Sequence, residues 1–144
     1  MAGIVVSIKA KNPGGVRKIL EGLDGRKIRR TVAKQGSFVI QQMVKRQFAT
    51  QQDPYGKRWK RKKVPDGRPV LTGETRQLRR NISSRTTTSG FRIHANTPYA
   101  SFHQSGTGRM PQRKIFPVSS DGLPRKWKQT ISAIAGVQIR KLSR

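Results

Sequence analysis

The chain has 144 residues, of which 32 are Lys or Arg and six are Asp or Glu, giving a formal net charge of +26. An excess of one sign this large costs stability through self-repulsion, so it indicates a polyanion, first of all nucleic acid, or an acidic protein as partner. The absence of cysteine excludes disulfides and thiolate metal sites, and no apolar run approaches the ~20 residues of a membrane span.

The length and the modest apolar content predict one domain spanning residues 1–144, with a small core. The first nine residues lack a basic stretch ahead of an apolar one, so we expect no secretion signal there. A β-branched run from Ile4 to Ile8 instead predicts a strand, followed by a turn at residues 12–15. Apolar residues at helical spacing then predict a short helix near residues 16–23.

A long helix is predicted over residues 26–49, with Asp24 as a candidate cap. It contains no proline, and Gly36 in its middle predicts a close contact with another helix. Its apolar positions recur near the helical period: Ile28, Val32, Val39, Met43 and Phe48.

A long basic loop follows at residues 50–76, where turn residues precede a run in which six of seven residues are cationic. Trp59 lies inside this run, and two interpretations of it remain open. In the first interpretation, Trp59 stacks on nucleic-acid bases while the cations contact phosphates. In the second, it anchors the loop to the core. The predicted contact with nucleic acid or an acidic partner comprises Lys57, Arg58, Trp59, Lys60, Arg61, Lys62 and Lys63.

Two extended segments, residues 78–88 and 91–95, predict a β-hairpin. A further strand is expected at residues 99–104, then a glycine-containing loop, then a second helix from Leu123 to about Ile134 and a basic tail. The predicted fold class is therefore α+β: a mostly antiparallel β-sheet packed by one long helix, with a second C-terminal helix and a long basic loop.

The inventory of catalytic groups is nearly empty, since the chain has two histidines and few carboxylates. His94 and His103 are conceivable metal ligands or nuclease bases, but no carboxylate lies close to either in sequence. The favoured interpretation of His103 is a half-buried residue that hydrogen-bonds to the backbone. We expect neither an enzyme nor a cofactor.

Three blocks between Phe48 and Phe116 resemble the phage virion morphogenesis family, the tail-completion proteins of Mu-like tailed phages. The first is Phe48 with Gln51-Gln-Asp-Pro-Tyr-Gly-Lys-Arg-Trp59, and the second is Leu71-Thr-Gly73 with Leu78. The third and most specific is Tyr99-Ala-Ser-Phe-His-Gln-Ser-Gly106, continued by Met110-Pro-Gln-Arg113 and Phe116.

Each block also has a physical interpretation. The turn around Pro54 lets Trp59 fold back on the helix at Met43 and Phe48. Thr72-Gly73 permits a sharp entry into the hairpin. Tyr99 and Phe102 are expected to be core anchors on a strand, with the His103 ring holding the loop that follows, and Arg113 is expected to pin that loop through its guanidinium.

The resemblance implies a structural virion protein of the neck or upper tail, whose copies form a ring, expected to be a hexamer, that joins head and tail. Its expected partners are itself, neighbouring neck, connector and tail-tube proteins, and genomic DNA, with no membrane. The rivals are a free nucleic-acid-binding protein using Trp59 and a metal-dependent nuclease using His103. The predicted assembly loop comprises Tyr99, His103, Gln104, Gly106, Gly108, Arg109 and Arg113.

Overall fold

The computed structural model describes residues 4–9, 25–73, 75–87 and 90–142. The predicted turn at residues 12–15, the short helix at 16–23, the Asp24 cap and the last two residues of the tail lie outside these ranges. The elements in chain order are β1 (Ile4–Lys9), α2 (Gly25–Thr50), α3 (Gln77–Arg80), β2 (Ile82–Thr87), β3 (Gly90–Ala95), α4 (Ala100–Ser105) and α5 (Arg125–Leu142).

The described strands form a three-stranded sheet in the order β1-β3-β2, and both pairings are antiparallel. Residue Ile93 in the central strand pairs with Val6 on one side and Ser84 on the other. The strand predicted near Ile4, the hairpin and the α+β class are therefore confirmed. The hairpin begins later than predicted, because residues 77–80 form the short helix α3.

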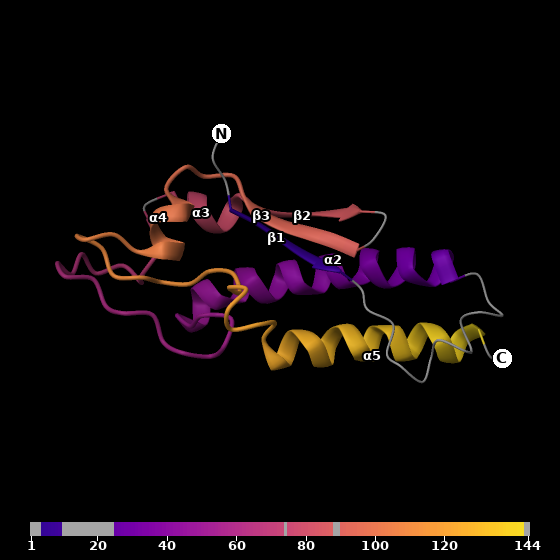
Figure 1. Cartoon of the computed structure of the whole chain (residues 1–144). Helices are drawn as coiled ribbons and strands as arrows, with labels where there is room; N and C mark the ends of the chain where they lie inside the picture. The colour runs from indigo at the N-terminus through magenta and orange to yellow at the C-terminus, as the bar shows by residue number, and fades with distance from the viewer. Residues whose placement is uncertain (1–3, 10–24, 74, 88–89, 143–144) are drawn as a thin grey trace.

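Helix α2 confirms the long helix predicted from the 3.6-residue period, and it packs across one face of the sheet (Figure 1). Its buried stripe includes Val32, Ile40 and Val44. Gly36 does provide a close contact, but with a strand. A Cβ placed there would lie 3.1 Å from the ring of Phe91 on β3, so the glycine lets the helix approach the sheet.

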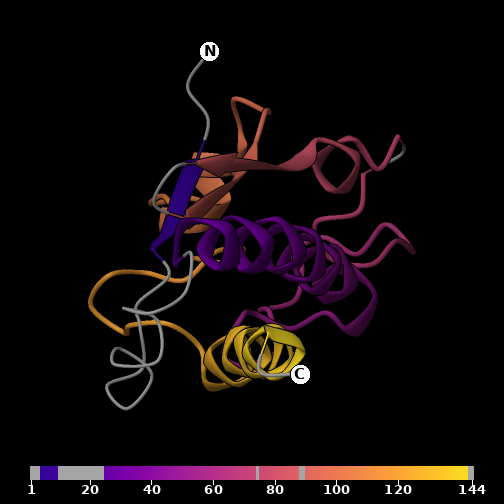
Figure 2. The same cartoon turned by 90° about the vertical axis from the view of Figure 1, so that its right-hand side faces the viewer.

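Helix α5 packs on the other side of α2, so the molecule is layered as sheet, long helix, second helix (Figure 2). Trp127 anchors α5 and is almost fully buried. The helix runs to Leu142 rather than ending near Ile134, because its later residues continue along α2, where Gln138 Nε2 donates to Gln35 Oε1 at 3.0 Å.

The prediction of a strand at residues 99–104 is wrong, because the chain forms helix α4 there. Tyr99 and Phe102 are also not core anchors, since 37% and 53% of these residues is exposed. The buried residue of α4 is Ala100. A helix that follows Pro98 buries one narrow stripe, and the two aromatic rings fall outside it.

Candidate assembly surface at one end of the fold

The chain leaves α2 through a tight turn. Gln51 adopts a left-handed backbone conformation, with φ 57°. One carboxylate oxygen of Asp53 accepts hydrogen bonds from the backbone N–H groups of Tyr55 and Lys57, at 2.9 and 2.8 Å. Gly56 supplies the positive φ that the turn requires. This confirms the tight helix exit predicted around Pro54.

The Gln51 side chain then holds the far end of the basic loop. Its Nε2 donates to the carbonyl of Val70 at 3.1 Å, and its Oε1 accepts from the N–H of the same residue at 2.6 Å. The two bonds bring residues 51 and 70 together, so the loop is closed at its base.

Trp59 anchors the basic loop to the core. Only 7% of the residue is exposed, its ring meets that of Phe48 edge-on at 5.5 Å, and its Nε1 donates to the carbonyl of Lys114 at 2.8 Å. The predicted fold-back onto Phe48 is confirmed. The alternative in which Trp59 stacks on bases is wrong for this structure, because a buried ring presents no face to a ligand.

Arg113 joins the basic loop to the segment after α4. Its guanidinium donates to the carbonyls of Lys60 and Arg61, at 2.8 and 3.0 Å, and the residue is buried. Arg113 was expected to pin the glycine-containing loop, but the loop that its side chain holds is the basic one. Residues 51–72 and 105–118 thus lie side by side at one end of the molecule, which we call the tip (Figure 1).

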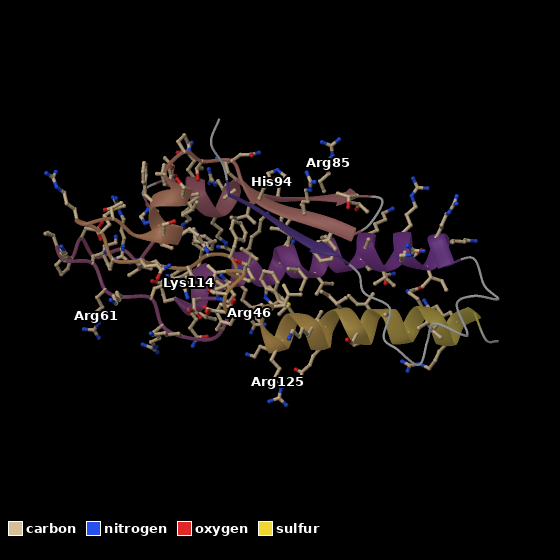
Figure 3. The ribbon with its side chains drawn as sticks, viewed as in Figure 1. Arg46, Arg61, Arg85, His94, Lys114 and Arg125 are labelled. Atoms are coloured by element: carbon tan, nitrogen blue, oxygen red, sulfur yellow. The ribbon has the colours of Figure 1, made fainter. Side chains whose placement is uncertain are left out.

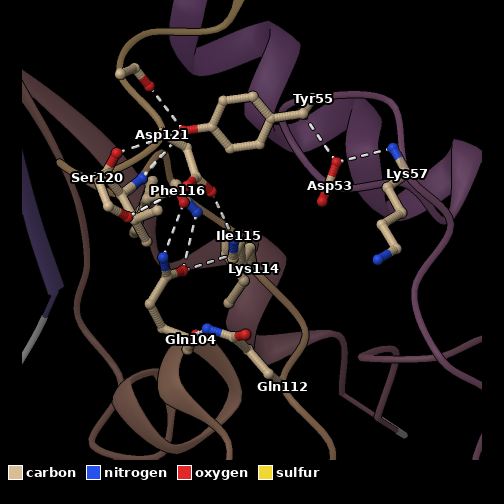
Figure 4. A network of polar contacts seen from close by, with 12 residues as sticks. Asp53, Tyr55, Lys57, Gln104, Gln112, Lys114, Ile115, Phe116, Ser120 and Asp121 are labelled. Carbon is tan, nitrogen blue, oxygen red and sulfur yellow. Dashed lines mark hydrogen bonds and ion pairs between the residues drawn. The ribbon is translucent and has the colours of Figure 1, made fainter.

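Gln104 holds the second half of the tip to α4 (Figure 4). Its Oε1 accepts from the backbone N–H groups of Ile115 and Phe116, at 2.8 and 3.0 Å, and its Nε2 donates to the carbonyl of Phe116 at 2.8 Å. Gln47 of α2 adds a buried bond to the carbonyl of Ile115, at 2.9 Å. The extended segment at residues 115–116 therefore has its polar backbone groups satisfied by two glutamines.

A polar cluster joins the start of the basic loop to the segment that precedes α5 (Figure 4). The Tyr55 hydroxyl donates to the carbonyl of Gly122 at 2.7 Å, and Lys114 pairs with Asp121 at 2.7 Å. The hydrogen bond between these two side chains raises the pKa of Lys114 and lowers that of Asp121. Both groups are solvent-exposed, so the pair orients the segment more than it stabilises the fold.

Gly106 and Gly108 have different surroundings. Gly106 has φ 75°, and a Cβ there would lie 2.9 Å from the backbone nitrogen of Gln112, so only glycine fits. Gly108 has nothing within 4 Å of its Cβ position. Two backbone hydrogen bonds between Thr107 and Met110, at 2.9 and 3.2 Å, close the turn that contains Gly108. Arg109 is exposed in this turn.

His103 holds the following segment through its backbone, because its carbonyl accepts from the N–H of Arg113 at 2.8 Å. A hydrogen bond from the His103 ring to the backbone was predicted, but the Nδ1 atom does not form one. It is buried without a hydrogen-bond partner among the described atoms. Burial lowers the pKa of His103, and the nearby charge of Arg113 lowers it further. The ring of Tyr99 packs edge-on against that of His103 at 6.1 Å.

The tip exposes cations together with apolar side chains. Lys62 pairs with Asp66 at 2.7 Å, and the remaining cations of the run point into solvent, as Arg61 does in Figure 3. Val64 is 79% exposed, and Phe102 of α4 lies close to the tip with more than half of its surface exposed. The exposed cations of the two loops are Lys57, Arg58, Lys60, Arg61, Lys63, Arg68 and Arg109.

The structure assigns positioning roles to residues that the sequence analysis did not single out. Gln47 was not marked by any local pattern, and Gln51 was named only as part of the first block, because their bonds reach residues 68 and 19 positions away. Arg85 and Arg92 were also missed. The predicted segments, residues 78–88 and 91–95, would have placed Arg85 opposite His94, whereas the observed register pairs Thr87 with Gly90 and Arg85 with Arg92.

The described part of the chain contains neither a cluster of metal-ligating side chains nor a helix that could span a membrane. No three His, Asp or Glu residues gather there in a way that could hold an ion. No described helix is both long enough and apolar enough to cross a bilayer. His94 shares a 2.8 Å hydrogen bond with Ser83 on the sheet, away from His103.

Comparison with known proteins identifies the family. The model of the phage virion morphogenesis family matches residues 15–131, a range that includes both loops of the tip and most of the layers that support it. No curated protein matches the chain, and no solved structure does. The residues that hold the tip together, Trp59, Gln104 and Arg113, all lie within the matched range. The chain belongs to the phage virion morphogenesis family, and its role is structural, in the assembly of the virion.

Proposed function

We propose that this chain is a structural subunit of the phage neck or upper tail, which forms a ring, a hexamer, at the junction of head and tail. The observation that carries the proposal is the tip. Two loops separated by about fifty residues are joined there by partly buried hydrogen bonds from Trp59 and Arg113 into one protrusion. A protrusion held this firmly, yet rich in exposed side chains, suits docking to a neighbouring protein.

Ring formation uses the edges of the sheet. The order β1-β3-β2 leaves one edge of β1 and one edge of β2 without a described strand beside it. Such edges offer unpaired N–H and C=O groups to another chain. Copies of this subunit that associate through these edges form a head-to-tail contact, which closes into a ring when the rotation allows.

The tip contacts an acidic neighbouring ring. Protein interfaces combine apolar or aromatic anchors with a polar rim, and the tip presents Val64 and Phe102 near exposed Lys and Arg side chains. Opposite charge on the neighbour would both steer the encounter and offset the self-repulsion of a +26 chain. The proposal includes no catalytic step and no cofactor.

The test combines native mass spectrometry and negative-stain imaging of the purified protein, alone and with neighbouring virion proteins. We expect rings, and we expect Lys60→Gln/Lys63→Gln to weaken docking while leaving the rings intact. The control is Lys126→Gln/Lys128→Gln, which removes the same charge from exposed positions of α5. A monomer that coats DNA and never assembles would contradict the proposal.

A further inference from the structure

The sheet has one covered face and one uncovered face. Helix α2 covers the first, where Ile82, Phe91 and Ile93 are buried, and no described element packs over the middle of the second (Figures 1 and 2). We call the second the open face. Its described side chains are Ser83, Arg85 and Thr87 of β2 with Arg92 and His94 of β3.

Two arginines lie directly opposite each other on the open face. Arg85 pairs with Arg92 in the β2–β3 register, both residues are exposed, and neither side chain forms a hydrogen bond or ion pair with a described residue. Figure 3 shows Arg85 pointing away from the sheet, on the side opposite α2. Like charges directly opposite on neighbouring strands are destabilising. The pair therefore costs the isolated fold stability, and a bound anion would remove that cost.

The described carboxylates are occupied elsewhere. Asp53 accepts backbone N–H groups in the turn after α2, Asp66 pairs with Lys62, and Asp121 pairs with Lys114. All three belong to the tip or its border. Within the described ranges, no acid of the chain itself neutralises the arginine pair.

The chemistry of the open face favours a nucleic-acid backbone over a protein. Its described side chains are all polar, and His94 and Ser83 share a 2.8 Å hydrogen bond that holds both at the surface. The β1 register adds the positions of Ser7 and Lys9, together with Val5, which is the one aliphatic position on this face among the described strands. Interface centres between proteins need aromatic or aliphatic anchors, whereas phosphate contacts come from Arg, Lys, Ser and Thr.

The open face is also rigid. Gln41 of α2 donates to the carbonyl of Ile82 at 3.1 Å and accepts from the Ser84 hydroxyl at 2.7 Å, which ties β2 to the helix beneath it. Phe91 packs on Gly36 from the same side. The arginines therefore project from a backbone whose position is set before a ligand binds, so the backbone loses little ordering entropy on binding.

We propose that the open face binds the phosphate backbone of duplex DNA, without base specificity, through Arg85 and Arg92. Planar guanidinium groups form paired hydrogen bonds with phosphate oxygens, and the neighbouring hydroxyls are additional donors. A flat sheet face with no protruding helix reads no base edges, so the contact is blind to sequence. The inference rests on the proposed function for its biological setting, because a ring at the head-tail junction surrounds the passing genome.

The test measures binding of a short labelled DNA duplex by fluorescence anisotropy over a range of salt concentrations. Each neutralised phosphate contributes about 0.9 to the slope of log affinity against log salt, so Arg85→Gln/Arg92→Gln should lower the slope by about 1.8. When salt rises from about 50 to about 200 mM, the factor by which DNA affinity falls should be about twelve times smaller for this variant than for the wild type. The charge-matched control is Lys60→Gln/Lys63→Gln, whose slope should stay near that of the wild type.

Equal slopes for the two double variants would overturn the inference, because binding would then follow total charge alone. Ring formation is measured on the same samples. If Arg85→Gln/Arg92→Gln forms rings and its slope is unchanged, the inference is overturned and the proposed function stands. If the slope is reduced but neither this variant nor the wild type forms rings, the proposed function is overturned and the inference stands. Loss of rings in this variant with a wild-type slope would make the open face an interface between copies, which also overturns the inference.

Discussion

The tip and the open face both expose arginine to solvent, yet they differ in what surrounds the charge. At the tip, Val64 follows the cationic run and Phe102 of α4 lies close by, both exposed, and the loops are held by partly buried bonds from Trp59 and Arg113. On the open face, the side chains of β2 and β3 around Arg85 and Arg92 are all polar, and the support comes from a regular sheet. A mixed apolar and cationic surface suits a protein, and a purely polar cationic one suits phosphate.

This difference teaches that net charge alone does not identify the partner of a basic protein. The value of +26 first directs attention to the densest cationic run, residues 57–63. In the fold, the aromatic ring of that run is buried, and the exposed cations around it project from irregular backbone. The less conspicuous arginines of the hairpin have the more regular geometry for a repeating anionic backbone.

The largest effect should come from separating the tip from the core. Trp59→Ala removes a buried ring that contacts Phe48 and donates to Lys114, so we expect the free energy of unfolding to fall by about 3–5 kcal/mol. Urea denaturation measures this loss. Trp59→Phe keeps an aromatic ring and loses the hydrogen bond, at about 1 kcal/mol. If Trp59→Ala costs no more than Trp59→Phe, the tip is not anchored as described.

A smaller effect should follow from distorting the tip locally. Gly106→Ala places a methyl group 2.9 Å from the Gln112 backbone nitrogen at a positive φ, so we expect a loss of about 1–3 kcal/mol in the free energy of unfolding. Gly108→Ala is the matched control, because its Cβ position is open, and it should change stability by less than about 0.5 kcal/mol. Equal costs for the two substitutions would contradict the geometry of this loop.

Acid should weaken the tip through His103. The pKa of this ring is lowered in the folded state, so the unfolded chain binds the proton more readily. Stability is therefore fully present above the ordinary value of 6.5 and is lost as the pH falls through the lower folded pKa. Melting temperatures across this window should fall more steeply for the wild type than for His103→Leu. Parallel curves would show that His103 does not titrate differently on folding.

The smallest effect, and of opposite sign, is expected on the open face. Arg92→Thr removes the like-charge contact with Arg85 and places a β-branched residue in the strand, so we expect the free energy of unfolding to rise by about 0.2–1 kcal/mol. Differential scanning calorimetry measures the change. Lys63→Gln, an exposed charge at the tip, is the control and should stay within about 0.5 kcal/mol of the wild type. A clear loss of stability in Arg92→Thr would show that the pair supports the fold.

Elements with strong local patterns could be predicted from the sequence. The apolar period of α2 continues along the whole helix without proline, and two extended segments close together in sequence predict the hairpin. Residues 99–104 could not, because a short segment with two aromatics carries strand and helix signals of similar strength. The segment forms a helix, because α4 buries Ala100 while its carbonyls and the Gln104 side chain bind the neighbouring segment.

The candidate sites were only partly predictable for a similar reason. The residue types at the tip drew attention through charge and through the family resemblance, but their roles depend on bonds between distant parts of the chain. Arg113 reaches carbonyls more than fifty positions earlier, as does Trp59 in the opposite direction. Long-range bonds of this kind leave no periodic pattern in the sequence. The opposition of Arg85 and Arg92 depends on the exact hairpin register, which the predicted segments placed two residues away from the observed one.

Photo-cross-linking in assembled virions tests the division between the two surfaces most directly. A photoreactive residue in place of Thr87 samples the open face without removing either arginine, and one in place of Lys63 samples the tip. Our account predicts adducts with DNA from position 87 and adducts with a neighbouring virion protein from position 63. Protein adducts from position 87 together with DNA adducts from position 63 would contradict it.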